Sequence, residues 1–159
     1  MGIQLAIALG NEVTAISSSP SKETACREMG AKDFILSTDY KELNKASQSL
    51  DLILNTISAP HQAGKYLSLL ARNGTLVQLG INMDAHNIYQ SVLMHMRLSL
   101  TGSSIGGIRE TQECIDLCAE KGIKPRVELV TADKLGEVYV RLSEKNDGVK
   151  RFVLDVVNS

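Results

Sequence analysis

Short apolar runs alternate with stretches in which apolar residues recur every three or four positions along most of this chain. The first pattern is typical of buried β-strands, and the second of amphipathic helices that cover a sheet. The pattern predicts strands over residues 12–17, 33–36, 51–57, 75–79, 97–101, 127–130 and 151–156. It predicts helices over residues 2–10, 22–29, 40–48, 62–71, 109–121 and 132–143. We therefore expect an α/β fold with a doubly wound parallel sheet.

Glycine and proline mark where several of these elements begin and end. Gly10, Gly30 and Gly122 follow predicted helices, where glycine is favoured because it readily adopts a left-handed conformation. Pro20 is expected to open the helix over residues 22–29, and the Asn-Gly pair at residues 73–74 to end the helix over 62–71.

Composition excludes several classes of function. The chain has 159 residues, 43% of them hydrophobic, which is enough for one core with a small appendage. Its net charge of −1 gives no attraction to nucleic acid or to an anionic membrane. No apolar run approaches the ~20 residues of a membrane-spanning helix, and the start lacks the basic segment of a signal peptide. Three cysteines without a metal-binding spacing suit a reducing compartment, so we expect a cytoplasmic protein.

The chain lacks the glycine-rich fingerprint of dinucleotide-binding folds. In such folds the G-x-G-x-x-G turn follows the first, central strand and holds the pyrophosphate at a helix N-terminus. Gly102, Gly106 and Gly107 have a different spacing and follow the fifth predicted strand. From the pattern alone, a dinucleotide-binding fold, a flavodoxin-like fold and a receiver-like fold all remain open.

A set of motifs in order along the chain gives a more specific indication. These are MGIQLA (1–6), EVTAISSS (12–19), MGAKDFILSTD (29–39), DLILNTISAPH (51–61), GTLVQLG (74–80), GSSIGGIRETQE (102–113) and KRFVLDV (150–156). Together they resemble the zinc-dependent, medium-chain alcohol dehydrogenases of the cinnamyl alcohol dehydrogenase group, over essentially the whole chain.

The resemblance implies a domain organisation. It implies that residues 1–122 form an NADP-binding Rossmann domain that lacks its first strand, because the family's glycine-rich loop ends directly before Met1. It also implies that residues 123–159 are a strand–helix–strand segment of a missing GroES-like catalytic domain. The family's first strand lies between strands 12–17 and 51–57, so we expect these two to be separated by roughly 10 Å.

The adenine half of the cofactor would bind after the second family strand. NAD-preferring Rossmann proteins place a carboxylate there, whereas this chain has Ser17, Ser18 and Ser19, followed by Lys22. Hydroxyl donors and a cation suit the 2′-phosphate of NADP. From the residues alone, a solvated turn with a helix cap at Ser21 is the favoured interpretation. The resemblance favours phosphate binding, although Pro20 and Ser21 replace basic residues that are frequent in the family.

The other half of the cofactor would meet the carboxyl ends of later strands. The resemblance assigns Thr56, Gly80, Ser103, Ser104 and Ile105 to the nicotinamide half. The alternative is that Thr56 is an ordinary strand residue, Gly80 a turn glycine, and residues 103–105 a connection without a binding role.

One further contact is implied on the last predicted strand. The resemblance places Arg151 near the pyrophosphate, and a surface strand arginine is the alternative.

The family's chemistry is hydride transfer between an alcohol and the nicotinamide, with zinc as the Lewis acid. Its zinc ligands come from the missing N-terminal domain, and none is found in this chain. Cys114 and Cys118 are interpreted as core residues, and His86 and His95 as unrelated to any motif. His61 lies in a turn after a predicted strand; the sequence favours a surface histidine, and an approach to the site is the alternative. We therefore expect no catalytic and no metal-binding residue here, and no activity from the chain alone, even with zinc.

The leading hypothesis is thus the NADP(H)-binding portion of an alcohol/aldehyde oxidoreductase, whose substrate would be a small alcohol such as a cinnamyl-type alcohol. A second is a catalytically silent nucleotide-binding or interaction module, with a homodimer formed through strand 98–101. A third is an incomplete gene model or a degraded copy.

Overall fold

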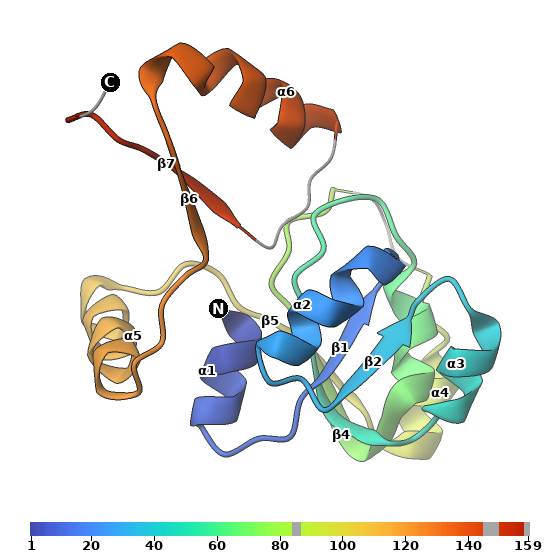
Figure 1. Ribbon diagram of the computed structural model, residues 1–159. Helices are drawn as coiled ribbons and strands as arrows, with labels where there is room; N and C mark the ends of the chain where they lie inside the picture. Colours follow the sequence, from blue (N-terminus) through green and yellow to red (C-terminus); the bar gives the residue numbers. More distant parts are fainter. Residues whose placement is uncertain (84–86, 145–149, 158–159) are drawn as a thin grey trace. The chain divides into compact units, whose positions relative to one another are not determined.

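The computed structural model describes residues 1–83, 87–144 and 150–157 (Figure 1). The α-helices are α1 (Gly2–Ala8), α2 (Glu23–Glu28), α3 (Tyr40–Lys45), α4 (Gln90–Met96), α5 (Ile108–Glu120) and α6 (Leu135–Glu144). Short 3₁₀ helices are η1 (Pro20–Lys22), η2 (Ala63–Leu69) and η3 (Ala132–Lys134). The strands are β1 (Thr14–Ser17), β2 (Asp33–Leu36), β3 (Leu50–Asn55), β4 (Leu70–Gln78), β5 (Ser99–Gly102), β6 (Val127–Val130) and β7 (Arg151–Leu154). The predicted α/β class is confirmed.

The described strands form three sheets. β1 pairs with β2, β4 lies between β3 and β5, and β6 pairs with β7. The pairs β3–β4, β4–β5 and β6–β7 are parallel, as predicted. β1 and β3 belong to different sheets, which agrees with the expectation that they do not pair directly. The separation of roughly 10 Å between them stays a prediction.

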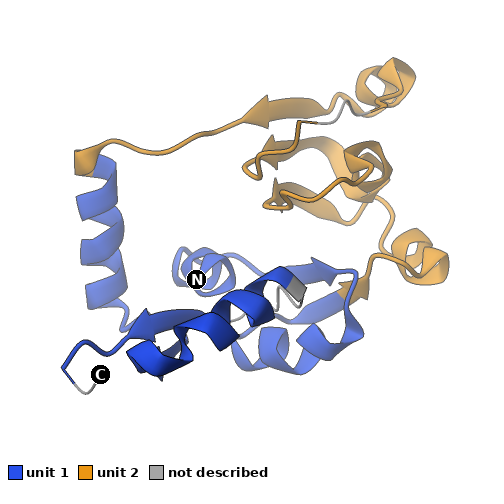
Figure 2. Ribbon diagram, turned by 90° about the horizontal axis from the view of Figure 1, so that it is seen from above, with its two compact units in different colours: residues 1–34, 110–159 blue, residues 35–109 orange. Residues whose placement is uncertain are grey.

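The chain divides into two compact units (Figure 2). Unit 1 contains residues 1–34 and 110–159, and unit 2 contains residues 35–109. The predicted organisation into residues 1–122 and 123–159 stays a prediction. None of the described helices has both the length and the apolar character needed to cross a membrane.

The core of unit 2 lies under its three-stranded sheet. Leu69, Leu70 and Leu76 are completely buried. Leu76 occupies the central strand, where it is in register with Ile53 of β3 and Leu100 of β5. Burying a leucine side chain contributes about 1.5–3 kcal/mol, so these three residues are major contributors to the stability of this unit.

Unit 1 has a smaller core around one cysteine. Cys26 packs with Ala15 and Ala31, and the partly buried Ile3 and Met29 contact this cluster. Burial raises the pKa of the Cys26 thiol, although the nearby cations Lys22 and Arg126 oppose this effect. Because the thiolate is the reactive form, Cys26 is a structural and not a nucleophilic residue.

The glycines expected at helix ends do lie there. Gly10, Gly30 and Gly122 have φ values of +84°, +98° and +65°, which a residue with a Cβ atom adopts only with strain. After α1, the amide of Asn11 donates to the carbonyl of Ala6, which satisfies a free carbonyl at the helix end.

Two parts of the predicted element order were wrong. The segment predicted as the helix over 62–71 is a 3₁₀ helix that ends at Leu69, and the Asn-Gly pair at 73–74 lies inside β4. The amides of Gln48 and Ser49 donate to the carbonyls of Ser68 and Leu69, so residues before β3 hold this segment against the sheet. Helix α4 was not predicted at all.

The interpretation of Cys114 and Cys118 as core residues was also wrong. Cys114 is exposed and Cys118 only partly buried, because α5 has no buried residue. The exposed side chains of this helix include Ile108 and Ile115.

The strand proposed for dimerisation lies at the edge of its sheet. All four residues of β5 are exposed, and β4 covers only one of its two sides. An edge strand offers unpaired backbone groups to a partner strand. A homodimer through residues 98–101 stays a prediction.

An ion cluster joins the elements near the carboxyl end of the chain. Glu128 on β6 accepts hydrogen bonds from Arg141 of α6 at 2.7 Å and from Lys150 at 3.3 Å. These contacts, the one to Arg141 first, lower the pKa of the Glu128 carboxyl to about 2. The Arg141 guanidinium also lies 4.5 Å from the centre of the Phe152 ring of β7.

The lowered pKa predicts a dependence of stability on pH. A carboxyl whose folded pKa lies below its unfolded pKa stabilises the fold above the unfolded value, and this stabilisation is lost as the pH falls from about 4.5 towards about 2. We expect Glu128→Gln to lower the melting temperature at neutral pH and to flatten the fall of melting temperature over this window. Glu137→Gln on α6 is the control, since Glu137 has no ion pair within the described part of the chain. An unchanged pH profile for Glu128→Gln would contradict the assignment.

Candidate nucleotide-binding site at the carboxyl ends of the strands

A serine-rich turn follows β1. The amide of Ser19 donates to Oγ of Ser17 at 3.2 Å, and the Oγ atoms of Ser19 and Ser21 lie 2.7 Å apart. Pro20 begins η1, and the amide of Lys22 donates to the carbonyl of Ser19 at 3.2 Å. The turn therefore presents three serine hydroxyls from a backbone that is held by local hydrogen bonds.

The alternative of a helix cap at Ser21 was wrong. Ser19 occupies the position before η1, while Ser21 lies inside that helix and pairs with Ser19. Ser18 is exposed, and Ser17, Ser19 and Lys22 are half-buried. Lys22 forms no ion pair within residues 1–83, 87–144 and 150–157, and the turn itself contains no carboxylate. Within residues 17–22 Lys22 is the one charged side chain, and the carboxylate of the next residue, Glu23, pairs with Arg27.

The carboxyl ends of β3, β4 and β5 are joined by backbone hydrogen bonds. The carbonyl of Asn55 accepts from the amides of Leu79 and Gly80, both at 2.9 Å. The amide of Ser103 donates to the carbonyl of Gln78 at 3.1 Å. These bonds bring Thr56, Gly80 and Ser103 to one edge of the sheet, as the sequence predicted for strands that run parallel.

Gly80 is required by the close approach of two strand ends. A Cβ atom at this position would lie 2.3 Å from the carbonyl oxygen of Ile57 and 2.7 Å from the carbonyl carbon of Thr56. Any side chain would therefore push the two strand ends apart. Gly80 keeps the end of β4 in contact with the turn that follows β3.

A buried asparagine and a half-buried glutamine form a pair of side-chain amides next to these strand ends. Asn55 is only 4% exposed, and its Nδ2 donates to Oε1 of Gln78 at 2.7 Å. The same Nδ2 lies 2.8 Å from Nε2 of His61, which is half-buried and thus not the surface residue that was predicted. Nε2 of Gln78 donates to the carbonyl of Gly80 at 2.7 Å. Asn55 and Gln78 were not predicted as site residues, although polar residues near the ends of apolar strands are a usable signal.

The remaining predicted residues lie apart from these contacts. Ser104 and Ile105 are exposed in the connection after β5, with Ile105 97% exposed. Arg151 is exposed on β7, where its amide donates to the carbonyl of Arg126. Ser17–Ser19, Lys22 and Arg151 belong to unit 1, and Thr56, Gly80 and residues 103–105 belong to unit 2.

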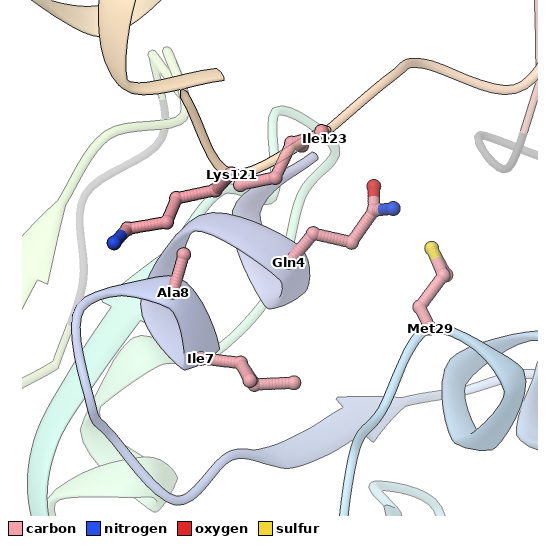
Figure 3. Close-up of a pocket in the computed structure, with 7 residues that line it drawn as sticks. Gln4, Ile7, Ala8, Met29, Lys121 and Ile123 are labelled. Carbon is pink, nitrogen blue, oxygen red and sulfur yellow. The ribbon is translucent and has the colours of Figure 1, made fainter. Parts of the chain in front are cut away.

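A separate hollow of about 350 Å³ lies in unit 1 (Figure 3). It is lined by residues of α1, by Met29 and by the segment that follows α5. No predicted cofactor-binding residue lines it.

Metal-ligating residues do not gather in the described part of the chain. Residues 1–83, 87–144 and 150–157 contain no group of three or more His, Cys, Asp or Glu side chains that could hold a metal ion. His95 lies on α4, and its Nδ1 bonds to the carbonyl of Ser91 in the same helix. His86 lies outside the described residues.

Parallel strands with polar and glycine residues at their carboxyl ends define this chain as a Rossmann-like α/β domain. The sequence matches the family model of zinc-binding dehydrogenases over residues 1–120, and the chain belongs to this family. The resemblance inferred from the motifs is thereby confirmed.

Individual relatives narrow the comparison. The chain is 41% identical over 160 residues to the probable cinnamyl alcohol dehydrogenase 1 of Nicotiana tabacum, and it covers 44% of that protein with 100% of its own length. It is 42% identical over 156 residues to the NADP-dependent alcohol dehydrogenase C of Mycobacterium tuberculosis. This alignment covers 98% of this chain and 45% of that protein. The chain thus spans less than half the length of these relatives.

Solved structures confirm the fold. A cinnamyl alcohol dehydrogenase from Sorghum bicolor superposes with a TM-score of 0.91 at 34% identity, over 100% of this chain and 45% of that one. The cinnamyl alcohol dehydrogenase from Helicobacter pylori, solved as a complex with NADP(H), superposes with a TM-score of 0.84 at 28% identity, again over 100% and 45%.

Proposed function

We propose that this chain supplies the NADP(H)-binding part of an alcohol/aldehyde oxidoreductase. The observation that carries the proposal is the turn after β1. It holds Ser17, Ser18 and Ser19 and contains no carboxylate, and its Lys22 forms no ion pair within the part of the chain that the structure describes. A carboxylate at this place would repel a 2′-phosphate, whereas hydroxyls, backbone amides and an ammonium group attract it. The names of the relatives from Mycobacterium and Helicobacter, which mention NADP, support the same cofactor.

The other predicted residues take complementary roles in this proposal. Gly80 keeps the ends of β3 and β4 close together where the nicotinamide half would bind, and Thr56, Ser103, Ser104 and Ile105 follow the carboxyl ends of β3 and β5. Arg151 would pair with the pyrophosphate. Bound NADP(H) would supply hydride exchange with a primary alcohol or its aldehyde, such as a cinnamyl-type alcohol. The chain's own residues bind and orient the cofactor.

The described residues do not fit a zinc centre. A catalytic zinc site needs three protein ligands, and no such group is found in residues 1–83, 87–144 and 150–157. The proposed role of this chain is therefore limited to cofactor binding, and no catalytic step is assigned to its side chains. A cytoplasmic location is part of the same proposal.

Removing the Lys22 charge tests the phosphate assignment. We expect Lys22→Ala to weaken NADP⁺ binding by about tenfold, because a hydrogen bond to a charged group contributes about 1.5–3 kcal/mol. Binding of NAD⁺, which has no 2′-phosphate, should not change. Isothermal titration calorimetry measures both affinities, and Lys45→Ala on α3 is the matched loss of one positive charge. If Lys22→Ala weakened NADP⁺ and NAD⁺ binding equally, the proposal that Lys22 contacts the 2′-phosphate would be wrong.

A further inference from the structure

The side chains of Asn55, Gln78 and His61 form a network whose hydrogen-bond directions can be assigned. The carbonyl of Ala59 can only accept, so Nδ1 of His61, 2.9 Å away, must carry the proton. In the neutral imidazole Nε2 then has a free lone pair, and it accepts from Nδ2 of Asn55 at 2.8 Å. The second hydrogen of Nδ2 goes to Oε1 of Gln78.

Two backbone groups fix the orientation of the amides. The amide of Ile57 donates to Oδ1 of Asn55 at 3.2 Å, which requires the oxygen of the Asn55 side chain on that side. Nε2 of Gln78 donates to the carbonyl of Gly80, which requires nitrogen there. Nδ2 of Asn82 also donates to the carbonyl of Ala59, at 3.3 Å, so with Nδ1 protonated its 3.5 Å distance from Nδ1 of His61 separates two donors and is not a hydrogen bond.

The side chains of the network form hydrogen bonds with backbone groups at the strand ends proposed to contact the cofactor. It holds Ile57 and Ala59 in the turn after β3, and Gly80 after β4. Gly80 and the turn approach so closely that a methyl group would not fit between them. The His61 ring is in turn supported by Tyr66, which is 5% exposed and whose ring centre lies 6.3 Å away.

We propose that His61 is a positioning residue for the nicotinamide half of the cofactor site. As the Nδ1–H tautomer, it connects the turn after β3 to the amide pair and so fixes the backbone of the turn relative to Gly80. This inference rests on the proposed NADP(H) binding. It assigns to His61 no contact with the cofactor and no proton transfer.

The test compares two ligands that differ in the nicotinamide half. NADP⁺ would contact both halves of the site, whereas adenosine 2′,5′-bisphosphate contains only the adenine half with its 2′-phosphate. In calorimetric titrations of the 159-residue chain, we expect His61→Ala to weaken NADP⁺ binding by roughly threefold to tenfold, which corresponds to one or two hydrogen bonds. Binding of adenosine 2′,5′-bisphosphate should not change.

Two further variants separate positioning from general destabilisation. His61→Gln retains an acceptor for Asn55, so it should bind NADP⁺ more tightly than His61→Ala does. His95→Ala is the control, because the His95 side chain bonds to the carbonyl of Ser91 in its own helix and to nothing else among the described residues. Equal NADP⁺ affinity of wild type and His61→Ala, or a parallel loss for both ligands, would overturn the inference. Failure of the wild-type chain to bind NADP⁺ would instead overturn the proposed function.

The tautomer can be measured directly in the wild-type chain without any ligand. Long-range ¹H–¹⁵N correlation spectra distinguish a protonated ring nitrogen from a bare one, and comparison with His61→Gln assigns the His61 signals. We expect a protonated Nδ1 and a bare Nε2 at neutral pH. Protonation on Nε2 would overturn the inference, even if the alanine variant failed to fold.

Discussion

Leu76→Ala is expected to lower the free energy of unfolding of this chain by about 2–5 kcal/mol, the range observed for buried leucines. Leu76 is completely buried in the central strand of unit 2, so a cavity would open between the sheet and its core. Small domains are stable by only about 5–15 kcal/mol, and the variant would therefore lose a large part of its stability. Urea denaturation followed by circular dichroism measures the change.

The same substitution on the neighbouring strand is the control. Leu100 is in register with Leu76, but its side chain is 45% exposed at the sheet edge. We expect Leu100→Ala to cost less than about 1 kcal/mol. Similar losses for the two variants would show that the sheet is not buried as described.

Gly80→Ala is expected to abolish detectable NADP⁺ binding and to lower the free energy of unfolding by about 1–3 kcal/mol, as overpacking does elsewhere. The new methyl group would lie 2.3 Å from the carbonyl oxygen of Ile57. It can be accommodated only if the end of β4 moves away from β3, which breaks the hydrogen bonds from Leu79 and Gly80 to Asn55.

Gly136→Ala on α6 is the matched glycine substitution. A Cβ atom there would meet nothing within 4 Å, and alanine is favoured over glycine in a helix by about 1 kcal/mol. This variant should be as stable as the wild type or more stable. Normal NADP⁺ affinity in Gly80→Ala would contradict the proposed role of this edge.

The elements predicted correctly from the sequence are those set by local chemistry. Gly10, Gly30 and Gly122 end helices because of their own backbone freedom, and the apolar run of β3 forms a strand that buries Ile53, although its neighbours Leu52 and Leu54 stay exposed. These signals need no knowledge of distant residues. They were sufficient for the α/β class and for most strand positions.

The errors concern segments whose conformation depends on distant partners. The predicted helix over residues 62–71 becomes a 3₁₀ helix followed by β4, because the amides of Gln48 and Ser49 pair with its carbonyls. Asn73 adopts a φ of +67° inside β4, where the register between β3 and β4 shifts. The Asn-Gly pair alone suggested a helix end at this position. The sequence pattern of one segment does not show such hydrogen bonds to another segment of the chain.

The location of the candidate site residues at the strand ends could be predicted from the sequence, but the side-chain contacts between them could not. Thr56, Gly80 and Ser103 were placed at one end of the sheet because the carboxyl ends of parallel strands meet there, and in the structure Gly80 bonds to Asn55, beside Thr56, while Ser103 bonds to Gln78. Asn55 and Gln78 are 23 residues apart, so their pairing exists only in the folded chain. His61 was predicted to be a surface residue for the same reason.

The dissociation constants of NADP⁺ and NAD⁺ for the wild-type chain, measured by calorimetry under the same conditions, test the central claim most directly. The positive, carboxylate-free turn around Ser17–Ser19 and Lys22 predicts that NADP⁺ binds more tightly than NAD⁺. The 159 residues contain no G-x-G-x-x-G turn that would hold the pyrophosphate, so we expect both cofactors to bind weakly to this chain. Tighter binding of NAD⁺, or equal affinity for the two cofactors, would contradict the assignment of this chain as an NADP(H)-binding domain.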